Sequence, residues 1–264
     1  MKNELKAIIK GYFTTLIFFA IIGLVGGFFV GLYLLDSYPE EIRVSLAEEM
    51  HAMGIGGFKA ETFLAIVTAI QSMIYGAFLG FFGIFFAKRA GLWKDERSIS
   101  KKPLALTLFL GFIGGLILIL PDVFIFGKYS EVLANQFATP PTVPYIIATV
   151  TYGAVIEEVM LRLFAMSLVA FILHKLFGKN EEKPKESILI ISNIVSAFIF
   201  ALGHLPTTVI LIGSTPLIIF RCILLNGTFG LVFGYLYRKY GLRYAMIAHG
   251  SCHVVSKLIW LIWL

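Results

Sequence analysis

The sequence predicts an all-α fold, a polytopic bundle of about seven transmembrane helices. Of its 264 residues, 58% are hydrophobic and only 14% are charged, whereas about a quarter of the residues of a soluble globular protein are charged. The apolar residues gather in runs of about 20, the length that an α-helix needs to cross the hydrocarbon of a bilayer. We therefore expect a single membrane domain over residues 1–264, in which helices pack against one another in lipid.

Seven apolar runs are long enough to be spans, and one further stretch leaves the count at seven or eight. The runs cover about residues 12–35, 62–87, 104–125, 145–173, 188–205, 216–237 and 244–263. The stretch 205–216 is apolar enough to dip into the membrane and would then change the count. The first run is too long for the core of a signal peptide, so we expect it to remain as a helix.

Basic residues mark every second connection, and this alternation predicts the orientation. Lys and Arg are concentrated in the N-terminus and after residues 87, 173 and 237, whereas the connections 36–61 and 121–144 are acidic or carry few charges. The positive-inside rule then predicts an integral protein of the cell membrane with a cytosolic N-terminus and an external C-terminus. Because the formal charge of +6 is spread over these loops, it indicates the lipid bilayer as a partner and no nucleic acid.

Two patterns concern packing. Residues 39–50 place Ile42, Leu46 and Met50 at a spacing of four, which predicts a helix lying on the outer interface of the membrane. Glycines recur at the same spacing as Gly23, Gly27 and Gly31, as Gly76 and Gly80, and as Gly230 and Gly234. Small residues at this spacing let helix backbones approach closely, so we expect these glycines on helix–helix contacts.

Three ionisable residues interrupt the fourth apolar run: Glu157, Glu158 and Arg162. Each charged group at the centre of a transmembrane helix costs about 2.5–3.5 kcal/mol, so three of them within six residues need a physical reason. Glu158 and Arg162 are four residues apart with the acid first, which predicts a buried ion pair. Such a pair leaves Glu157 unexplained, because its side chain is rotated by about 100° and needs another partner, a proton or water.

Three of the five histidines also lie within predicted spans: His204, His249 and His253. A single intramembrane histidine is more often a polar contact between helices than a catalyst. An unpaired carboxylate, together with His249 and His253 four apart on one helical face, indicates a functional cluster instead. A carboxylate in a dry pocket can take a proton from water while imidazoles hold that water or stabilise an oxyanion, so peptide hydrolysis fits. No G-x-S-x-G motif occurs, and activated water is favoured over a covalent intermediate.

These residues form three motifs. They are Glu157-Glu158-x-x-x-Arg162, Phe200-x-x-x-His204, and His249 in a late span. In this order they resemble the motifs of the CAAX protease and bacteriocin-processing family, the intramembrane group that includes the type II CAAX prenyl endopeptidase. The resemblance covers a motif core at residues 145–256. It implies a multi-helix endopeptidase that cuts peptides in the membrane and removes the last three residues of a prenylated protein C-terminus.

The resemblance also implies a role for each residue. Glu157 resembles the residue that activates water, and Glu158 and Arg162 resemble its supporting pair. His204 and His249 resemble the groups that position water or stabilise the oxyanion.

His253 departs from the family, which usually has Asn at this position as an oxyanion donor; an imidazole can donate there if its facing nitrogen is protonated. His249 and His253 have the spacing of a zinc-binding helix, and His204 would complete a three-ligand site with Glu157 as general base. However, Gly250 stands where the H-E-x-x-H motif has its Glu. We therefore expect metal-free catalysis, with zinc held by the three histidines as the alternative.

Two other functions compete with proteolysis. A proton-coupled transporter would use intramembrane carboxylates and histidines as a relay, but the sequence has no internal repeat and its ionisable cluster lies in the motif core. A non-enzymatic membrane scaffold or self-immunity protein would keep the residues without the reaction. For a protease, the many Phe and Leu residues predict a hydrophobic or prenylated peptide as substrate. We expect Asn226 to form an interhelical hydrogen bond, with an oxyanion role as the alternative, and Arg221 to snorkel toward a membrane surface.

Overall fold

The computed structural model describes residues 2–94, 99–178 and 181–264, and within these ranges the chain forms helices and connections but no strand. The long helical segments are α1 (Lys2–Ser37), α3 (Ala60–Ile74) with η1 (Tyr75–Leu79) and α4 (Gly80–Arg89), α5 (Lys101–Phe124), α7 (Val143–Ala148) with η4 (Thr149–Glu157), η5 (Val159–Met166) and α8 (Ser167–Phe177), α9 (Glu186–Leu211), α10 (Pro216–Tyr240) and α11 (Leu242–Trp263). Shorter elements are α2 (Glu40–Ala52), η2 (Phe126–Lys128), α6 (Glu131–Asn135) and η3 (Gln136–Ala138). The predicted all-α bundle is confirmed.

Six helices of the described chain are long and apolar enough to cross a membrane: Leu5–Ser37, Ala60–Arg89, Lys101–Tyr129, Glu186–Leu211, Pro216–Tyr240 and Leu242–Trp263. They coincide with six of the seven predicted spans. The remaining one, 145–173, is helical but is not among the six; it consists of α7, the π-helical stretches η4 and η5, and α8. The stretch 205–216 forms no eighth span, since α9 runs to Leu211 and α10 begins at Pro216.

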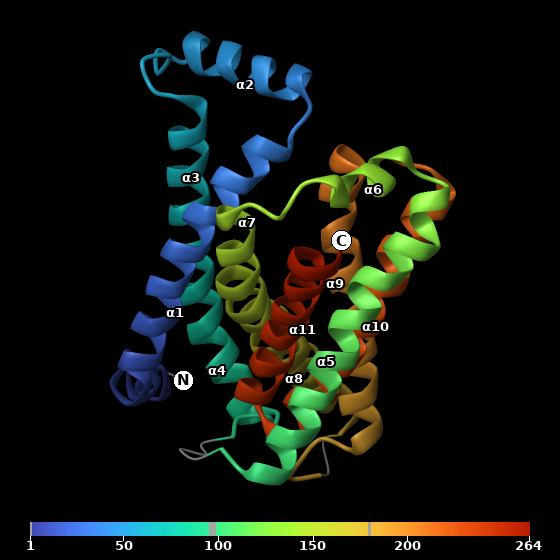
Figure 1. The fold of residues 1–264 in the computed structure, drawn as a ribbon. Coiled ribbons are helices and arrows are strands. Elements are labelled where there is room, and N and C mark those ends of the chain that lie inside the picture. The colour runs from blue at the N-terminus through green and yellow to red at the C-terminus, as the bar shows by residue number, and fades with distance from the viewer. Residues whose placement is uncertain (1, 95–98, 179–180) are drawn as a thin grey trace.

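The helix that carries the acidic motif lies in the middle of the bundle. Figure 1 shows α7 and its continuation beside α11, with α1 and α3 on one side and α5, α9 and α10 on the other. The N-terminus, the end of α4 and the start of α9 lie at one end of the molecule, whereas α2 and α6 lie at the other (Figure 1). The basic segments therefore share one end, as their alternation predicts. Which side of the membrane this end faces stays a prediction.

Glycines allow helix backbones to touch, as predicted. A Cβ atom at Gly27 would lie 2.3 Å from the carbonyl oxygen of Thr68, and one at Gly23 would lie 2.3 Å from that of Ser72. These two positions bring α1 into backbone contact with α3. A Cβ at Gly31, Gly76, Gly80, Gly230 or Gly234 would likewise meet a neighbouring atom at less than 3.0 Å. The helix predicted at 39–50 is present as α2, with only Met50 buried.

The π-helical stretches η4 and η5 carry the motif residues and are supported from outside the motif core. A Cβ at Gly26 in α1 would lie 2.8 Å from the backbone nitrogen of Tyr152 in η4. In the same way, a Cβ at Gly83 in α4 would lie 2.7 Å from Leu163 in η5. π-helical turns are rare and occur frequently at functional sites. The N-terminal helices thus hold the unusual backbone on which the candidate site stands.

Candidate active site

Glu158 and Arg162 form the predicted ion pair inside the bundle. Glu158 Oε1 lies 3.1 Å from Arg162 Nη1, and the side chains are 0% and 1% exposed. The guanidinium lies 4.5 Å from the ring centroid of Phe200 in α9 and 5.5 Å from that of Phe233 in α10. Its Nη2 donates a hydrogen bond to the carbonyl oxygen of Gly230, at 3.3 Å. Aromatic faces and a backbone carbonyl therefore hold the cation that the lipid would otherwise exclude.

His249 joins this pair from α11. Its Nδ1 lies 2.9 Å from Glu158 Oε1, and its ring stacks on Phe233 with the centroids 4.6 Å apart. Because an ionised carboxylate only accepts hydrogen bonds, Nδ1 carries the hydrogen, and Nε2 is the nitrogen that faces the site. The second oxygen of Glu158, Oε2, has no hydrogen-bond partner among the described residues. Glu158 thus orients an imidazole that is 91 residues away in sequence.

Glu157 and His253 lie on the other side of His249. His249 Nε2 is 3.1 Å from His253 Nε2 and 4.0 Å from Glu157 Oε2. With the hydrogen of His249 on Nδ1, His253 Nε2 is the donor between the two rings. The gap to Glu157 is too long for a direct hydrogen bond, but a water about 2.8 Å from both atoms fits it. The Glu157 side chain is 18% exposed, so it faces a more open region than Glu158.

Gly153 borders the two imidazoles. A Cβ there would lie 3.2 Å from His253 Nε2 and 3.8 Å from His249 Nε2. Any larger residue would fill the space next to these nitrogens. The only sequence signal for this role was a glycine four residues before Glu157.

His204 is separated from the other five by an aromatic ring. Its Nδ1 lies 2.9 Å from the carbonyl oxygen of Phe200 one turn earlier, and the two rings lie edge to face with centroids 4.6 Å apart. Phe200 in turn contacts His249, at 6.1 Å between centroids. Within the described chain, no hydrogen bond or ion pair joins His204 to the acidic motif or to α11. The structure therefore brings five of the six predicted residues into one network, with His204 next to it.

The geometry does not assemble the alternative zinc site. In residues 2–94, 99–178 and 181–264, no group of three or more His, Cys, Asp and Glu side chains is placed to hold a metal ion. Zinc in a catalytic site is bound by three protein ligands at about 2.0–2.2 Å. The Nε2 atoms of His249 and His253 are 3.1 Å apart, a separation that two nitrogen ligands of one zinc ion could adopt. Nδ1 of His204 is instead bound to the carbonyl oxygen of Phe200, and within the described residues no hydrogen bond joins His204 to the other two. The described residues therefore do not assemble the three-ligand site, and independence from metal stays a prediction.

Two further contacts near the site were not predicted from the sequence. Phe233 stacks on His249, and its only signal was a place between the packed glycines Gly230 and Gly234. Ser196 Oγ in α9 donates to the carbonyl oxygen of Leu161, at 2.7 Å. This bond gives a backbone acceptor of η5 a partner from another helix.

Two predictions about polar residues of α10 are wrong. Arg221 does not snorkel: its Nε and Nη2 bind the two carboxylate oxygens of Asp122, whose side chain is 3% exposed. Among the described residues Asn226 makes no interhelical bond, and its Nδ2 donates to the carbonyl oxygen of Cys222 one turn earlier, at 2.9 Å. Arg221 thus finds its partner on α5 instead of at the membrane surface, and Asn226 finds its partner within its own helix.

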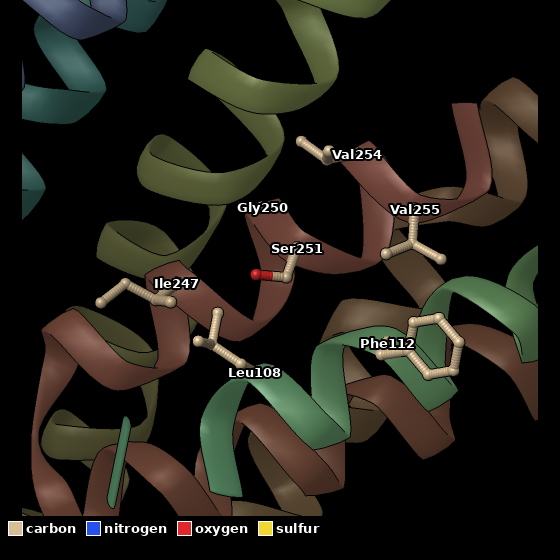
Figure 2. Close-up of a pocket in the computed structure, with 7 residues that line it drawn as sticks. All are labelled: Leu108, Phe112, Ile247, Gly250, Ser251, Val254 and Val255. Carbon is tan, nitrogen blue, oxygen red and sulfur yellow. The ribbon is translucent and has the colours of Figure 1, made fainter. Parts of the chain in front are cut away.

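Two cavities lie away from this network. One, of about 490 Å³, lies between α5 and α11 and is lined by Leu108, Phe112, Ile247, Gly250, Ser251, Val254 and Val255 (Figure 2). The other, of about 370 Å³, is bounded by Tyr12, Trp93 and Tyr240. None of the six candidate residues lines either cavity.

Comparison with known proteins gives one match. Residues 139–255 match the family model described as type II CAAX prenyl endopeptidase, Rce1-like. The matched segment contains all six candidate residues, from Glu157 to His253. No curated protein and no solved structure matched the chain.

Proposed function

We propose that the protein hydrolyses a peptide bond of a prenylated or very apolar peptide with water activated by Glu157, starting from the match of residues 139–255 to the Rce1-like type II CAAX prenyl endopeptidase model. The family match supports a CAAX-type protease in the membrane, and the apolar helices agree with it. The observation that carries the finer proposal is the 4.0 Å gap between Glu157 Oε2 and His249 Nε2. One water fits this gap with a base on one side and an oriented imidazole on the other.

In the proposed reaction, Glu157 takes a proton from this water and the oxygen attacks the carbonyl carbon of the scissile bond. The carbonyl oxygen becomes an oxyanion, which His253 Nε2–H stabilises after turning from His249. Glu157 then returns the proton to the leaving amine, and the C–N bond breaks. The side-chain shift of His253 is small, because its Nε2 lies only 3.1 Å from that of His249.

Glu158 and Arg162 act through His249. The carboxylate accepts the Nδ1 hydrogen at 2.9 Å and so fixes which ring nitrogen faces the water. Arg162 balances the charge of Glu158 in a region without solvent. His204 keeps Nε2 free because Nδ1 is bound to Phe200, and we assign it to contact the substrate rather than the water.

The proposed reaction uses no metal ion. This part of the proposal is supported by His204, whose Nδ1 is bound to Phe200 and which, within the described residues, forms no hydrogen bond with His249 or His253. The substrate class is supported by the family match and by the setting of Glu157, on a helix in the centre of a bundle whose outer helices are apolar.

The test is cleavage of a quenched fluorescent farnesylated CAAX peptide by the purified protein in detergent. Glu157→Gln keeps the size of the side chain and removes the base, so kcat should fall by about 10²–10⁴-fold. Glu48→Gln is the matched control: Glu48 is exposed on α2, and its activity should equal that of the wild type. Circular dichroism and gel filtration show whether each variant is folded.

A strong zinc chelator provides the second arm. Activity of the wild type should be unchanged by the chelator; loss of activity that added zinc restores would return His204, His249 and His253 to the role of ligands. Full cleavage by Glu157→Gln would refute the proposed base. Absence of cleavage by the wild type would favour a scaffold.

A further inference from the structure

Lys257 is a buried cation on the same helix as the candidate site. It lies in α11, and the residue is only 6% exposed. Its Nζ is 4.1 Å from the ring centroid of Tyr145 and 5.8 Å from that of Trp260. Among the described residues it has no ion pair and no hydrogen bond. An unpaired charge at this position is unfavourable in the free protein, and intramembrane ionisable residues usually serve a function.

A purely structural role does not explain Lys257. A lysine near the end of a transmembrane helix usually extends its ammonium to the membrane surface, but this side chain is enclosed by aromatic rings. The buried carboxylate of α5, Asp122, is already bound through both oxygens by Arg221. The part of the chain that the structure describes therefore supplies no anion for Lys257.

The two aromatic rings that face the ammonium, Tyr145 and Trp260, are themselves held by other side chains. Tyr33 of α1 stacks on Tyr145 of α7 at 4.3 Å between centroids. Trp260 packs edge to face with Phe137 at 5.0 Å, and its Nε1 donates to the carbonyl oxygen of Thr139 at 3.0 Å. These contacts hold the two rings beside the Lys257 Nζ. A largely buried ammonium with no other partner among the described residues is suited to binding a single carboxylate.

The position of Lys257 relative to the catalytic groups fits the length of a short peptide. His249, His253 and Lys257 follow one another at a spacing of four and so share one face of α11. Eight residues of helix separate His249 from Lys257, which is about 12 Å along the axis. An extended peptide spans about 3.3–3.6 Å per residue, so three to four residues cover this distance.

We propose that Lys257 binds the free C-terminal carboxylate of the substrate and thereby sets how many residues are removed. The inference rests on the proposed function and adds to it the group that recognises the end of the peptide. With the scissile carbonyl beside Glu157 and His249, a released segment of about three residues places its carboxylate at the level of Lys257. The enzyme then measures its cut from the C-terminus.

The test compares two farnesylated quenched peptides that differ only at the C-terminus, one ending in a carboxylate and one in an amide. For the wild type, kcat/KM should be at least tenfold higher for the acid, mainly through KM. Lys257→Met has a similar length and no charge. It should lower kcat/KM for the acid peptide to the value for the amide peptide and leave kcat/KM for the amide peptide unchanged. Lys257→Arg should keep part of the preference. Lys175→Met, at an exposed position of α8, is the matched control and should behave as the wild type.

A third peptide, longer by one residue between the farnesylated cysteine and the carboxylate, tests the distance. It should be a poor substrate for the wild type, and the difference should shrink in Lys257→Met. Equal cleavage of acid and amide by the wild type would overturn the inference while leaving the protease intact. Equal losses on both peptides in Lys257→Met would assign a structural role and would also overturn it. Failure of the wild type to cleave any of the peptides would overturn the proposed function itself, and this inference with it.

Discussion

Asp122–Arg221 and Glu158–Arg162 are both buried ion pairs of the bundle, and they use their carboxylates differently. Asp122 of α5 gives both oxygens to Arg221 of α10. Glu158 shares Oε1 between Arg162 and His249, and its Oε2 has no partner in the part of the chain that the structure describes. Both oxygens of Asp122 are bound by one arginine, and this pair joins α5 to α10. Glu158 uses one oxygen for both Arg162 and His249, and it thereby orients the imidazole of His249. A buried ion pair thus indicates function when its carboxylate also binds a third side chain that belongs to the site.

The largest expected effect comes from breaking the pair of Asp122 and Arg221. Arg221→Met leaves Asp122 buried and uncompensated, so the free energy of unfolding should fall by about 3–5 kcal/mol. Replacing both residues, as Asp122→Leu with Arg221→Met, should restore most of this loss, because a buried ion pair is often no more stable than apolar side chains of similar size. Unfolding in a denaturing detergent, followed by circular dichroism, measures both.

Arg43→Met is the control for that measurement. Arg43 pairs with Glu40 on the exposed side of α2, and an exposed pair contributes little to stability. If the double replacement at Asp122 and Arg221 abolished cleavage by folded protein, the pair would not be purely structural.

The second effect concerns activity. Glu158→Gln removes the charge that fixes His249 and should lower kcat/KM by about 10²-fold, the upper range for groups that orient a catalytic ligand or base. The matched change Asp122→Asn removes a charge of the same kind from the pair with Arg221 and should leave kcat/KM of the folded fraction unchanged. Rates are normalised to the folded fraction from gel filtration. Equal losses in the two variants would erase the distinction between the pairs.

The smallest effect concerns packing without charge. Gly27→Ala places a Cβ 2.3 Å from the carbonyl oxygen of Thr68, and relief of this overlap should reduce the free energy of unfolding by about 1–3 kcal/mol. Gly11→Ala is the matched control in the same helix, because no atom lies within 4 Å of its Cβ position. If Gly11→Ala lost as much stability as Gly27→Ala, the loss would come from the change of residue within the helix and not from the contact with Thr68.

Much of the fold followed from the sequence, because apolar length and glycine spacing report properties of single helices. Six of the seven predicted spans are helices that can cross a membrane, and Gly23 and Gly27 contact α3 as expected. The π-helical geometry of η4 and η5 was not predictable, since partners such as Ser196 on another helix contribute to it. The pairing of Asp122 with Arg221 was missed because the two residues are 99 positions apart.

The candidate site was also predictable only in part. The spacing of Glu158 and Arg162 gave their ion pair directly. The contact of His249 with Glu158 was not predicted, because no periodicity relates two helices that far apart. Helical spacing put His249 and His253 on one face but did not give the direction of each ring, and so it left the zinc site open as an alternative.

The distance in sequence between Glu158 and His249 has a consequence for how the protein is made. A ribosome adds about 5–20 residues per second, so the 91 residues between them correspond to about 5–18 s of synthesis. Until α11 has been made, the chain has no imidazole of His249 to accept the water of the proposed reaction. Under the proposed mechanism, the growing polypeptide is therefore inactive, and the capacity to hydrolyse arises only when α11 packs beside η4.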